Sequence, residues 1–489
     1  GDEEMSIVIQ LPARDRIVGL LDADSFVEIG AMVHARNTDF NMAEKATPAD
    51  GVITGYGTIE GKLVYVYSQD ADVLQGSVGE MHAKKIVRIY DLALKTGAPV
   101  IGLIDCAGMR LQEASDALNA FGELYYRQTM ASGVIPQIHG IFGKCGGGMA
   151  VMTALADFSF AVEGTGQVFI HSPNVLEGNH RERCDTSSSL FQSETAGRLA
   201  GVGADEKEVL DKIRGLVEIL PSNNKEDAFC MTENSDDLNR ENPFLENTLD
   251  SAYILKDISD NHAFFEIKKD YGREMVTGFI SLNGNTVGAV ANREEILGET
   301  GIVTERMEPV LTADGAGKAA DFIRFCDAFS IPVLTLVNVC GFKATMEEEK
   351  YMAEACAKLT YAYADASVPK VSVIIGKAYG SAYLSMGSRH IGADMVYAWP
   401  KARIGMMNSE SAVKIMYADE IEKSDEKNAL IAEKKERYER LQNSPESAAS
   451  RGYVDGIIEP AATRKRVIAA FEMLMTKRET GPDRKHGTV

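Results

Sequence analysis

The chain repeats one ordered pattern of segments, and this internal repeat limits the fold more than any other feature of its sequence. Gly55–Val66 contains two β-rich runs around a turn, and the same arrangement returns at Gly278–Val290. The turns fall at Glu60-Gly61 and Asn283-Gly284, dipeptides that suit the tight connection of a β-hairpin. Each half is therefore predicted to start its sheet with a hairpin.

An amphipathic helix and a buried strand are expected next in each half. They are predicted at 85–94 and 100–105 in the first half, and at 318–329 and 333–338 in the second. Pro99 and Pro332, which precede the two strands, are 233 positions apart, as are Gly108 and Gly341, which follow them. A constant spacing through several segments is the expected result of a duplication.

A third match completes the pattern. Apolar strands after 135–137 and 368–370 end in small-residue loops, and a helical segment and an Ala-Asp step follow at 156–157 and 393–394. Short strands are then expected at 167–170 and 395–398. The alternation predicts an α/β fold of two homologous domains, with mostly parallel sheets covered by helices.

The boundary between the two domains is predicted in the polar, turn-rich stretch 222–247. We place the first domain at 1–235 and the second at 245–489. A run rich in Glu, Lys and Ala after Tyr417, to about Arg440, is predicted to form an exposed helix.

Composition excludes several classes of protein. A formal charge of -21 argues against nucleic acid as a partner, which would need a clustered basic surface. Apolar runs stay below the roughly 18 residues that span a bilayer, and the acidic stretch Gly1–Gln10 does not resemble a signal peptide, so we expect a cytoplasmic protein. With no C-x-x-C pair, neither a structural zinc site nor any other metal site is expected. Free thiols are predicted for Cys106, Cys145, Cys184, Cys230, Cys326, Cys340 and Cys356.

In each half a strand runs into a loop of small residues that opens a helix. The loops are Gly146–Gly148 and Tyr379–Ala382. Small side chains let a ligand approach the backbone, and the free amides of a helix start suit a carbonyl oxygen that becomes negative during a reaction. Two such loops suggest one enzyme that handles two carbonyl groups. The alternative is that the glycines only permit close packing of helix and strand.

Other common chemistries find no support in the sequence. Neither a G-x-S-x-G elbow, an H-E-x-x-H pair nor a phosphate-binding loop occurs in a suitable context. The spaced glycines of Gly55–Gly61 lie in a hairpin, which argues against dinucleotide binding. A general base among His82, His139 and His171 is conceivable, but a hydrogen-bonded structural role is predicted for each.

The same segments resemble the carboxyltransferase subunits of biotin-dependent acyl-CoA carboxylases and decarboxylases. This family includes propionyl-CoA carboxylase β subunits and the α subunits of methylmalonyl-CoA and glutaconyl-CoA decarboxylases. The resemblance runs from about Ala13 to the C-terminus. It is carried by segments 13–22, 25–30, 50–61, 76–86, 131–137, 377–380, 392–394, 398–400 and 452–455.

The resemblance implies two crotonase-like (ClpP/crotonase) domains built from ββα units, with an active site between the first domain of one protomer and the second domain of another. Gly147 and Gly148 would hold the oxygen of an acyl-CoA thioester, and Ser381 and Ala382 the ureido oxygen of biotin. Further binding residues are expected at Gly108, Arg110, Gly146, Gly341, Phe342 and Gly380. In this family a side-chain base is not firmly required.

The resemblance also implies partners. Biotin would arrive on a separate carrier protein, with biotin carboxylase or decarboxylase subunits in the same complex. A homo-oligomer between a dimer and a hexamer is expected. The decarboxylase branch would place the chain beside a membrane complex. Neither the acyl group nor the direction of transfer follows from the sequence.

Departures from the family pattern leave two alternatives open. The family usually has Asp-Ser-Gly-Gly-Ala-Arg where this chain has Asp105–Arg110, and the biotin-side segment 340–358 is altered as well. One alternative is therefore a non-catalytic structural paralogue. The other is a crotonase-type hydratase or hydrolase that acts without biotin, which would need an acid/base residue such as Glu123 or Glu163.

Overall fold

Two compact units make up the chain, Gly1–Asp227 and Ala228–Val489. The computed structural model describes residues 10–229, 231–487 and 489, so the predictions for residues 1–9 and for Cys230 lie outside the described residues. Thr286 N donates to Ala228 O and Thr232 N donates to Gly284 O, each at 3.1 Å. Residues 228–235, predicted to end the first domain, therefore belong to the second unit.

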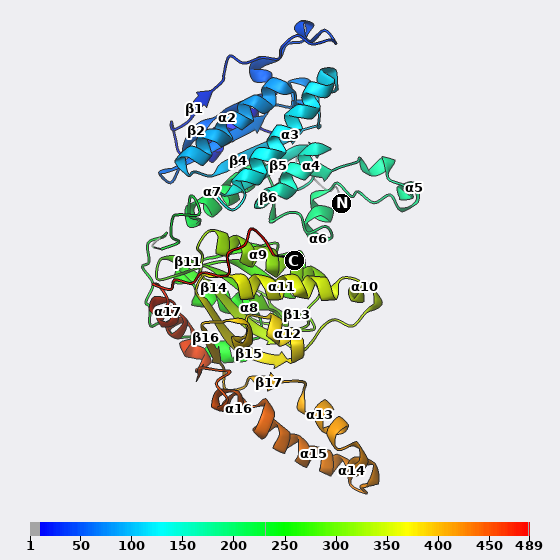
Figure 1. Ribbon diagram of the computed structural model, residues 1–489, viewed down its shortest axis with the longest axis vertical. Helices are drawn as coiled ribbons and strands as arrows, with labels where there is room; N and C mark the ends of the chain where they lie inside the picture. The colour runs from blue at the N-terminus through cyan, green and yellow to red at the C-terminus, as the bar shows by residue number, and fades with distance from the viewer. Residues whose placement is uncertain (1–9, 230, 488) are drawn as a thin grey trace. The chain divides into compact units, whose positions relative to one another are not determined.

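The first unit is an eight-stranded sheet covered by helices (Figure 1). The strands lie in the order β1-β2-β3-β4-β5-β6-β8, and β7 pairs with β5. Ile86 and Ile89 of one helix and Phe121 and Leu124 of the next pack in its core. The strands are β1 (Val27–Ile29), β2 (Val52–Ile59), β3 (Lys62–Gln69), β4 (Val100–Cys106), β5 (Gln137–Gly146), β6 (Phe158–Val162), β7 (Gln167–Phe169) and β8 (Gly201–Gly203). The helices are α1 (Ala13–Leu20), α2 (Glu80–Thr96), α3 (Ala114–Ala131), α4 (Gly148–Leu155), α5 (Asn179–Glu182), α6 (Ser189–Glu194) and α7 (Glu206–Ile219).

The second unit repeats this plan in the order β18-β16-β15-β14-β11-β10-β9, with β17 paired to β15. A separate two-stranded sheet joins β12 and β13. The strands are β9 (Phe264–Ile267), β10 (Met275–Leu282), β11 (Asn285–Asn292), β12 (Glu295–Leu297), β13 (Val303–Arg306), β14 (Val333–Val339), β15 (Lys370–Tyr379), β16 (Met395–Ala398), β17 (Arg403–Gly405) and β18 (Gly456–Ile457). The helices are α8 (Ser251–Ile258), α9 (Ala313–Ala328), α10 (Met346–Glu349), α11 (Met352–Asp365), α12 (Gly380–Ser385), α13 (Ser409–Met416), α14 (Ala418–Lys423), α15 (Lys427–Tyr438), α16 (Pro445–Ser450) and α17 (Thr463–Met473).

Both predicted hairpins form. In the β2–β3 turn Glu60 and Gly61 have φ of 48° and 77°, and in the β10–β11 turn Asn283 and Gly284 have φ of 52° and 77°. Two left-handed residues in sequence form the turn whose twist matches that of the strands, which favours Asn and Gly there. The second strand of each hairpin then pairs in parallel with β4 or β14.

One predicted equivalence between short strands is wrong. Residues 167–170 were matched with 395–398, but 395–398 is β16, which pairs with the first half of β15, as β6 does with β5. The strand β7 pairs with the end of β5, and its counterpart is β17, which pairs with the end of β15. The sequences of such short strands carry no information on which part of a neighbouring strand they join.

A buried lysine occupies the same place in each unit. Lys85 Nζ donates to Ala49 O at 2.7 Å, and Lys318 Nζ donates to the carbonyls of Lys268, Tyr271 and Met275 at 2.6–2.7 Å. These acceptors lie just before or at the start of the first hairpin strand, so each lysine ties helix α2 or α9 to its hairpin. Burial lowers the pKa of Lys85 to about 8 and that of Lys318 to about 7.

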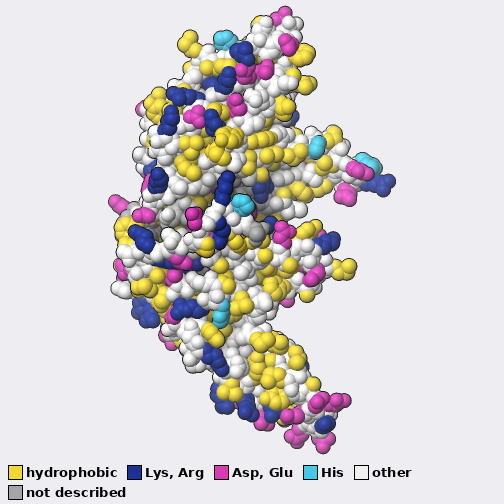
Figure 2. All heavy atoms as spheres, in the orientation of Figure 1, with side chains coloured by type: hydrophobic (Ala, Val, Ile, Leu, Met, Phe, Trp, Pro, Cys, Tyr) yellow, Lys and Arg dark blue, Asp and Glu magenta, His cyan; other side chains and the backbone are white. Residues whose placement is uncertain are grey.

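The predicted helix after Tyr417 is present as α14 and α15, and every residue of α15 is exposed or partly exposed. Acidic side chains gather at the end of the segment formed by α14 and α15, near α14 (Figures 1 and 2). They include Asp419, Glu420, Glu422, Asp425 and Glu426. In the described ranges, all helices are too short or too polar to cross a bilayer.

Candidate functional site

A bulge at the carboxyl end of the central strand leads to the small-residue loop in each unit. Between the pairs Ile104–Ile141 and Cys106–Cys145, strand β5 gains two residues over β4. Strand β15 gains two over β14 between the pairs Val337–Ile374 and Val339–Ala378. The strand ends that carry the two loops are therefore built with the same register.

A polar side chain from the neighbouring strand fills each bulge. A Cβ on Gly143 would lie 2.2 Å from Asp105 Oδ1, and one on Gly376 would lie 2.5 Å from Asn338 Oδ1, so a side chain at either position would displace that polar group. Asn338 Oδ1 accepts a hydrogen bond from Lys377 N at 3.0 Å. These four residues were not among the predicted site residues. The spacing of 233 that relates Asp105 to Asn338 and Gly143 to Gly376 is the signal that would have found them.

The first loop turns at Gly147, whose φ of 58° and ψ of -124° suit glycine. Its N–H donates to Phe169 O at 2.8 Å. The bond to β7 therefore uses the amide of Gly147, one of the two residues predicted to hold the thioester oxygen. The amide of Gly148 begins α4, where the helix supplies no acceptor, and the residue is partly exposed.

The N–H of Met109, on the neighbouring loop, is a second possible donor to a ligand. Val78 N donates to Gly108 O and Arg110 N donates to Val78 O, each at 2.9 Å. An extended chain alternates its donors, so the N–H of Met109 points away from Val78. In the described parts of the chain no acceptor for this N–H is found.

The glycines bring these two loops together. A Cβ on Gly146 would lie 2.8 Å from Ala107 O, and one on Gly108 would lie 3.2 Å from Gly146 O. The predicted residues Gly108, Gly146 and Gly148 therefore belong to one region of the first unit, where two backbones touch. Met109 and Gly148 each contribute to this region an amide for which the described residues supply no acceptor.

The second unit builds the same arrangement. Leu311 N donates to Gly341 O and Lys343 N donates to Leu311 O, each at 2.9 Å, so Phe342 corresponds to Met109. Phe342 is 40% exposed. Gly380 has a φ of 65° and would place a Cβ 3.2 Å from Met406 O.

The shared register pairs Gly147 with Gly380 and Gly148 with Ser381. Ala382 falls at the place of Met149, one residue further into the helix, and is only 1% exposed, whereas Ser381 is exposed. Of the predicted pair Ser381 and Ala382, Ser381 is thus the one that corresponds to Gly148. The 233-residue repeat identifies this correspondence, whereas the sequence of the loop alone does not.

Arg110 does not have the position of a ligand-binding residue. Its side chain is fully buried, and Nη1 donates to Asp50 Oδ1 at 2.6 Å and to Glu113 Oε2 at 2.7 Å. Nη2 donates to Ser77 O at 2.9 Å. Its guanidinium therefore fixes the loop that carries Gly108 and Met109 instead of meeting a substrate. Sequence reasoning missed this because Asp50 lies 60 positions away.

The histidines behave as predicted where they are buried. His82 bonds to Asp50 O through Nδ1 at 2.9 Å, and His139 contacts Tyr67 Oη at 3.0 Å. Burial lowers the pKa of His139 to about 4 and that of His82 well below its usual range, so neither gains a charge at neutral pH. His171 is exposed.

The two residues named for the acid/base alternative are both exposed. Glu123 is exposed on α3 and pairs with Asn119, and Glu163 is exposed in the turn after β6.

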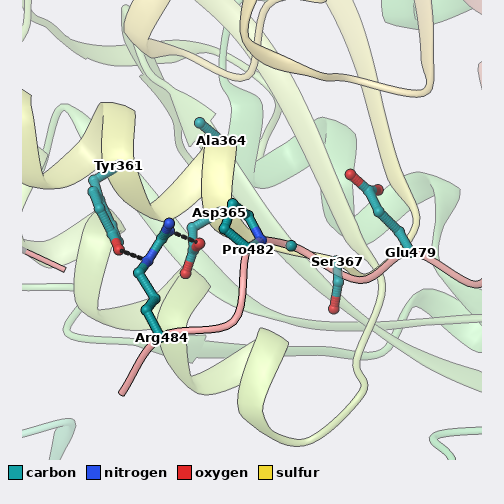
Figure 3. Close-up of a pocket in the computed structure, with 8 residues that line it drawn as sticks. Tyr361, Ala364, Asp365, Ser367, Glu479, Pro482 and Arg484 are labelled. Atoms are coloured by element: carbon teal, nitrogen blue, oxygen red, sulfur yellow. Dashed lines mark hydrogen bonds and ion pairs between the residues drawn. The ribbon is translucent and has the colours of Figure 1, made fainter. Parts of the chain in front are cut away.

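A cavity of about 210 Å³ lies between the end of α11 and the C-terminal segment, where Arg484 contacts Tyr361 and Asp365 (Figure 3). None of the predicted site residues lines it.

Comparison with known proteins agrees with this geometry. A match to the family described as "Carboxyl transferase domain" covers residues 10–489. The chain is 40% identical to methylmalonyl-CoA decarboxylase subunit alpha of Propionigenium modestum, over 98% of this chain and 93% of the relative. It is 41% identical to the carboxyltransferase subunit of propionyl-CoA carboxylase of Haloferax mediterranei, over 98% and 93%.

A solved structure shows the same fold. The transcarboxylase 12S hexamer, described with hydrolysed methylmalonyl-coenzyme A bound, superposes with a TM-score of 0.91 at 37% identity, over 98% of this chain and 92% of that one. The expected crotonase-like fold and the resemblance found in the sequence are both confirmed. This chain belongs to the carboxyl transferase domain family and is a carboxyltransferase subunit of the biotin-dependent acyl-CoA carboxylase and decarboxylase type.

Proposed function

We propose that the chain moves a carboxyl group between biotin on a separate carrier protein and an acyl-CoA, with the first unit on the acyl-CoA side and the second on the biotin side. The observation that carries this proposal is the equivalence of the strand-end loops in the two units, in which Gly148 corresponds to Ser381 and Met109 to Phe342. Two carbonyl oxygens must be stabilised in such a transfer, and the chain offers two equivalent places for them.

On the acyl-CoA side, the amides of Gly148 and Met109 would donate to the thioester oxygen. Removal of the α-proton, or loss of the carboxyl group, makes that oxygen negative. Donors that are already in place stabilise this charge without reorganisation, and each is worth about 3–4 kcal/mol. Gly147 and Gly146 act by shaping the loop, and Arg110 by fixing the loop that carries Met109.

On the biotin side, the amides of Ser381 and Phe342 would donate to the ureido oxygen. When bound, biotin supplies the nitrogen that carries the carboxyl group. The residues fit this group because Gly380 and Ser381 leave the backbone open, and the exposed ring of Phe342 offers a flat apolar surface beside it. Gly341 and Ala382 flank the two donors: Gly341 precedes Phe342, and Ala382 follows Ser381.

For assembly, we infer a homo-oligomer that works with a biotin carrier protein and a carboxylase or decarboxylase subunit. The related transcarboxylase 12S is described as a hexamer in a multienzyme core, which supports this inference. The acyl group is proposed to be of the acetyl, propionyl, methylmalonyl or glutaconyl type, since the relatives named above act on propionyl-CoA and methylmalonyl-CoA.

Carboxyl exchange with free biotin tests the proposed function. The purified chain is mixed with malonyl-CoA, methylmalonyl-CoA or glutaconyl-CoA, and the loss of the CoA-bound carboxylate is followed with and without biotin. Loss that depends on biotin is the expected result. A folded chain that removes no carboxylate from any of the three would favour the non-catalytic paralogue. Release of free CoA without biotin would favour the hydrolase alternative, and hydration of glutaconyl-CoA without loss of its carboxylate would favour the hydratase.

A further inference from the structure

The loop after β14 is longer and less anchored than its counterpart after β4. From Gly108 to the first residue of α3, Ala114, is 6 positions, whereas from Gly341 to the first residue of α11, Met352, is 11. The extra residues form α10, which lies at the outer end of this loop (Figure 1). Where the first unit has the buried Arg110, the second has the exposed Lys343.

One side chain ties this loop to the rest of the second unit. Glu348 Oε2 accepts a hydrogen bond from Ala313 N, the first residue of α9, at 2.7 Å. From Phe342 to Tyr351, Glu348 is the one residue that is not exposed. In the described chain, no other hydrogen bond or ion pair from residues 344–350 reaches a residue before this loop.

The first unit has a matching contact. Glu113 Oε1 accepts a hydrogen bond from Glu80 N, the first residue of α2, at 3.0 Å. Glu80 and Ala313 are 233 positions apart, so the capped helices are equivalent. A carboxylate suits this place because the first amides of a helix lack partners and the helix dipole is positive there. Glu113 is also held by Arg110, whereas no cation is paired with Glu348 in the described residues.

We propose that Glu348 is a positioning residue for the biotin side of the site. This inference rests on the proposed function, because it explains how Phe342 and its amide keep their place. By capping α9, Glu348 closes the exposed loop back onto the unit that carries Ser381. Without the cap, the loop after Lys343 loses its side-chain anchor, and Phe342 keeps only the two backbone bonds that join Gly341 and Lys343 to Leu311. The acyl-CoA side has its own glutamate and does not depend on this contact.

The test compares Glu348→Ala with Glu348→Gln and with Glu349→Ala, a neighbour that is exposed. The KM for free biotin and the KM for the acyl-CoA are measured separately in carboxyl exchange. Glu348→Ala is expected to raise the KM for biotin about three- to tenfold, the range that corresponds to a lost helix cap, and to leave the KM for acyl-CoA unchanged. Glu348→Gln keeps an acceptor oxygen and should restore most of the affinity. Glu349→Ala should resemble the wild type.

Amide hydrogen exchange gives a second readout that needs no turnover. Residues 342–351 of Glu348→Ala should exchange faster than in the wild type, with other segments unchanged. An unchanged rate in these residues, or an equal rise in both KM values, would overturn the positioning role. If the wild type transfers no carboxyl group, the proposed function fails, and the exchange rate of residues 342–351 still decides whether Glu348 holds the loop.

Discussion

Replacing Gly148 with valine is expected to lower kcat for carboxyl transfer by about a hundredfold or more, the effect of losing a donor at a developing oxyanion. A Cβ at this position would lie 2.8 Å from the Phe121 ring and 2.8 Å from Tyr125 Oη. Phe121 is packed in the core, so the start of α4 must shift instead, and the Gly148 amide moves with it. The rate of biotin-dependent loss of carboxylate measures the effect.

The matched control is Gly122→Val. Gly122 lies on the exposed side of α3, and a Cβ there would meet no atom within 4 Å. This variant should keep wild-type activity, which separates the effect of the site from that of adding a valine. Thermal unfolding of both variants shows that they are folded. A folded Gly148→Val protein with wild-type kcat would remove this amide from the mechanism.

Replacing Arg110 with methionine is expected to lower the free energy of unfolding by about 3–5 kcal/mol. The substitution leaves the carboxylates of Asp50 and Glu113 buried without their cation, and it frees Ser77 O as well. Unfolding of the first unit in urea, followed by the shift of its midpoint, measures the loss.

The control for this variant lies at the same register position in the second unit. Lys343 is exposed, and its side chain pairs with no carboxylate in the described chain. Lys343→Met should change the free energy of unfolding by no more than about 0.5 kcal/mol. If Arg110→Met unfolds at the urea concentration of the wild type, the buried ion pairs do not hold the loop.

Much of the fold could be predicted because its signals are local. The dipeptides Glu60-Gly61 and Asn283-Gly284 mark hairpins through backbone preferences that act within two residues. The apolar runs of β4 and β14 mark buried strands in the same way. The partner of a short strand is not a local property, so the sequence could not show whether β6 or β7 is the counterpart of β16. The division of the compact units at Asp227 and Ala228 is not a local property either, because Ala228 and Thr232 bond to a hairpin that lies more than 50 residues further on.

The site could be predicted in part for a similar reason. Spaced glycines revealed where two backbones approach, and Gly108, Gly146 and Gly148 do lie in one region. Which amide is free depends on tertiary contacts, and the bond from Gly147 N to Phe169 O could not be inferred from the loop sequence. The role of Arg110 likewise depends on Asp50, which lies in the turn before β2, 60 positions earlier in the chain.

The central claim is that each unit holds one carbonyl group, and Ser381→Pro tests it most directly. Proline removes the Ser381 amide hydrogen but fits the first turn of a helix. Ser381→Ala keeps that hydrogen and serves as the control. The measurement is acyl-CoA affinity by titration calorimetry, together with the rate of biotin-dependent carboxyl transfer. The account predicts that Ser381→Pro loses transfer and binds acyl-CoA as the wild type does, while Ser381→Ala keeps both. Wild-type transfer in a folded Ser381→Pro protein, or a loss of its acyl-CoA affinity, would contradict the account.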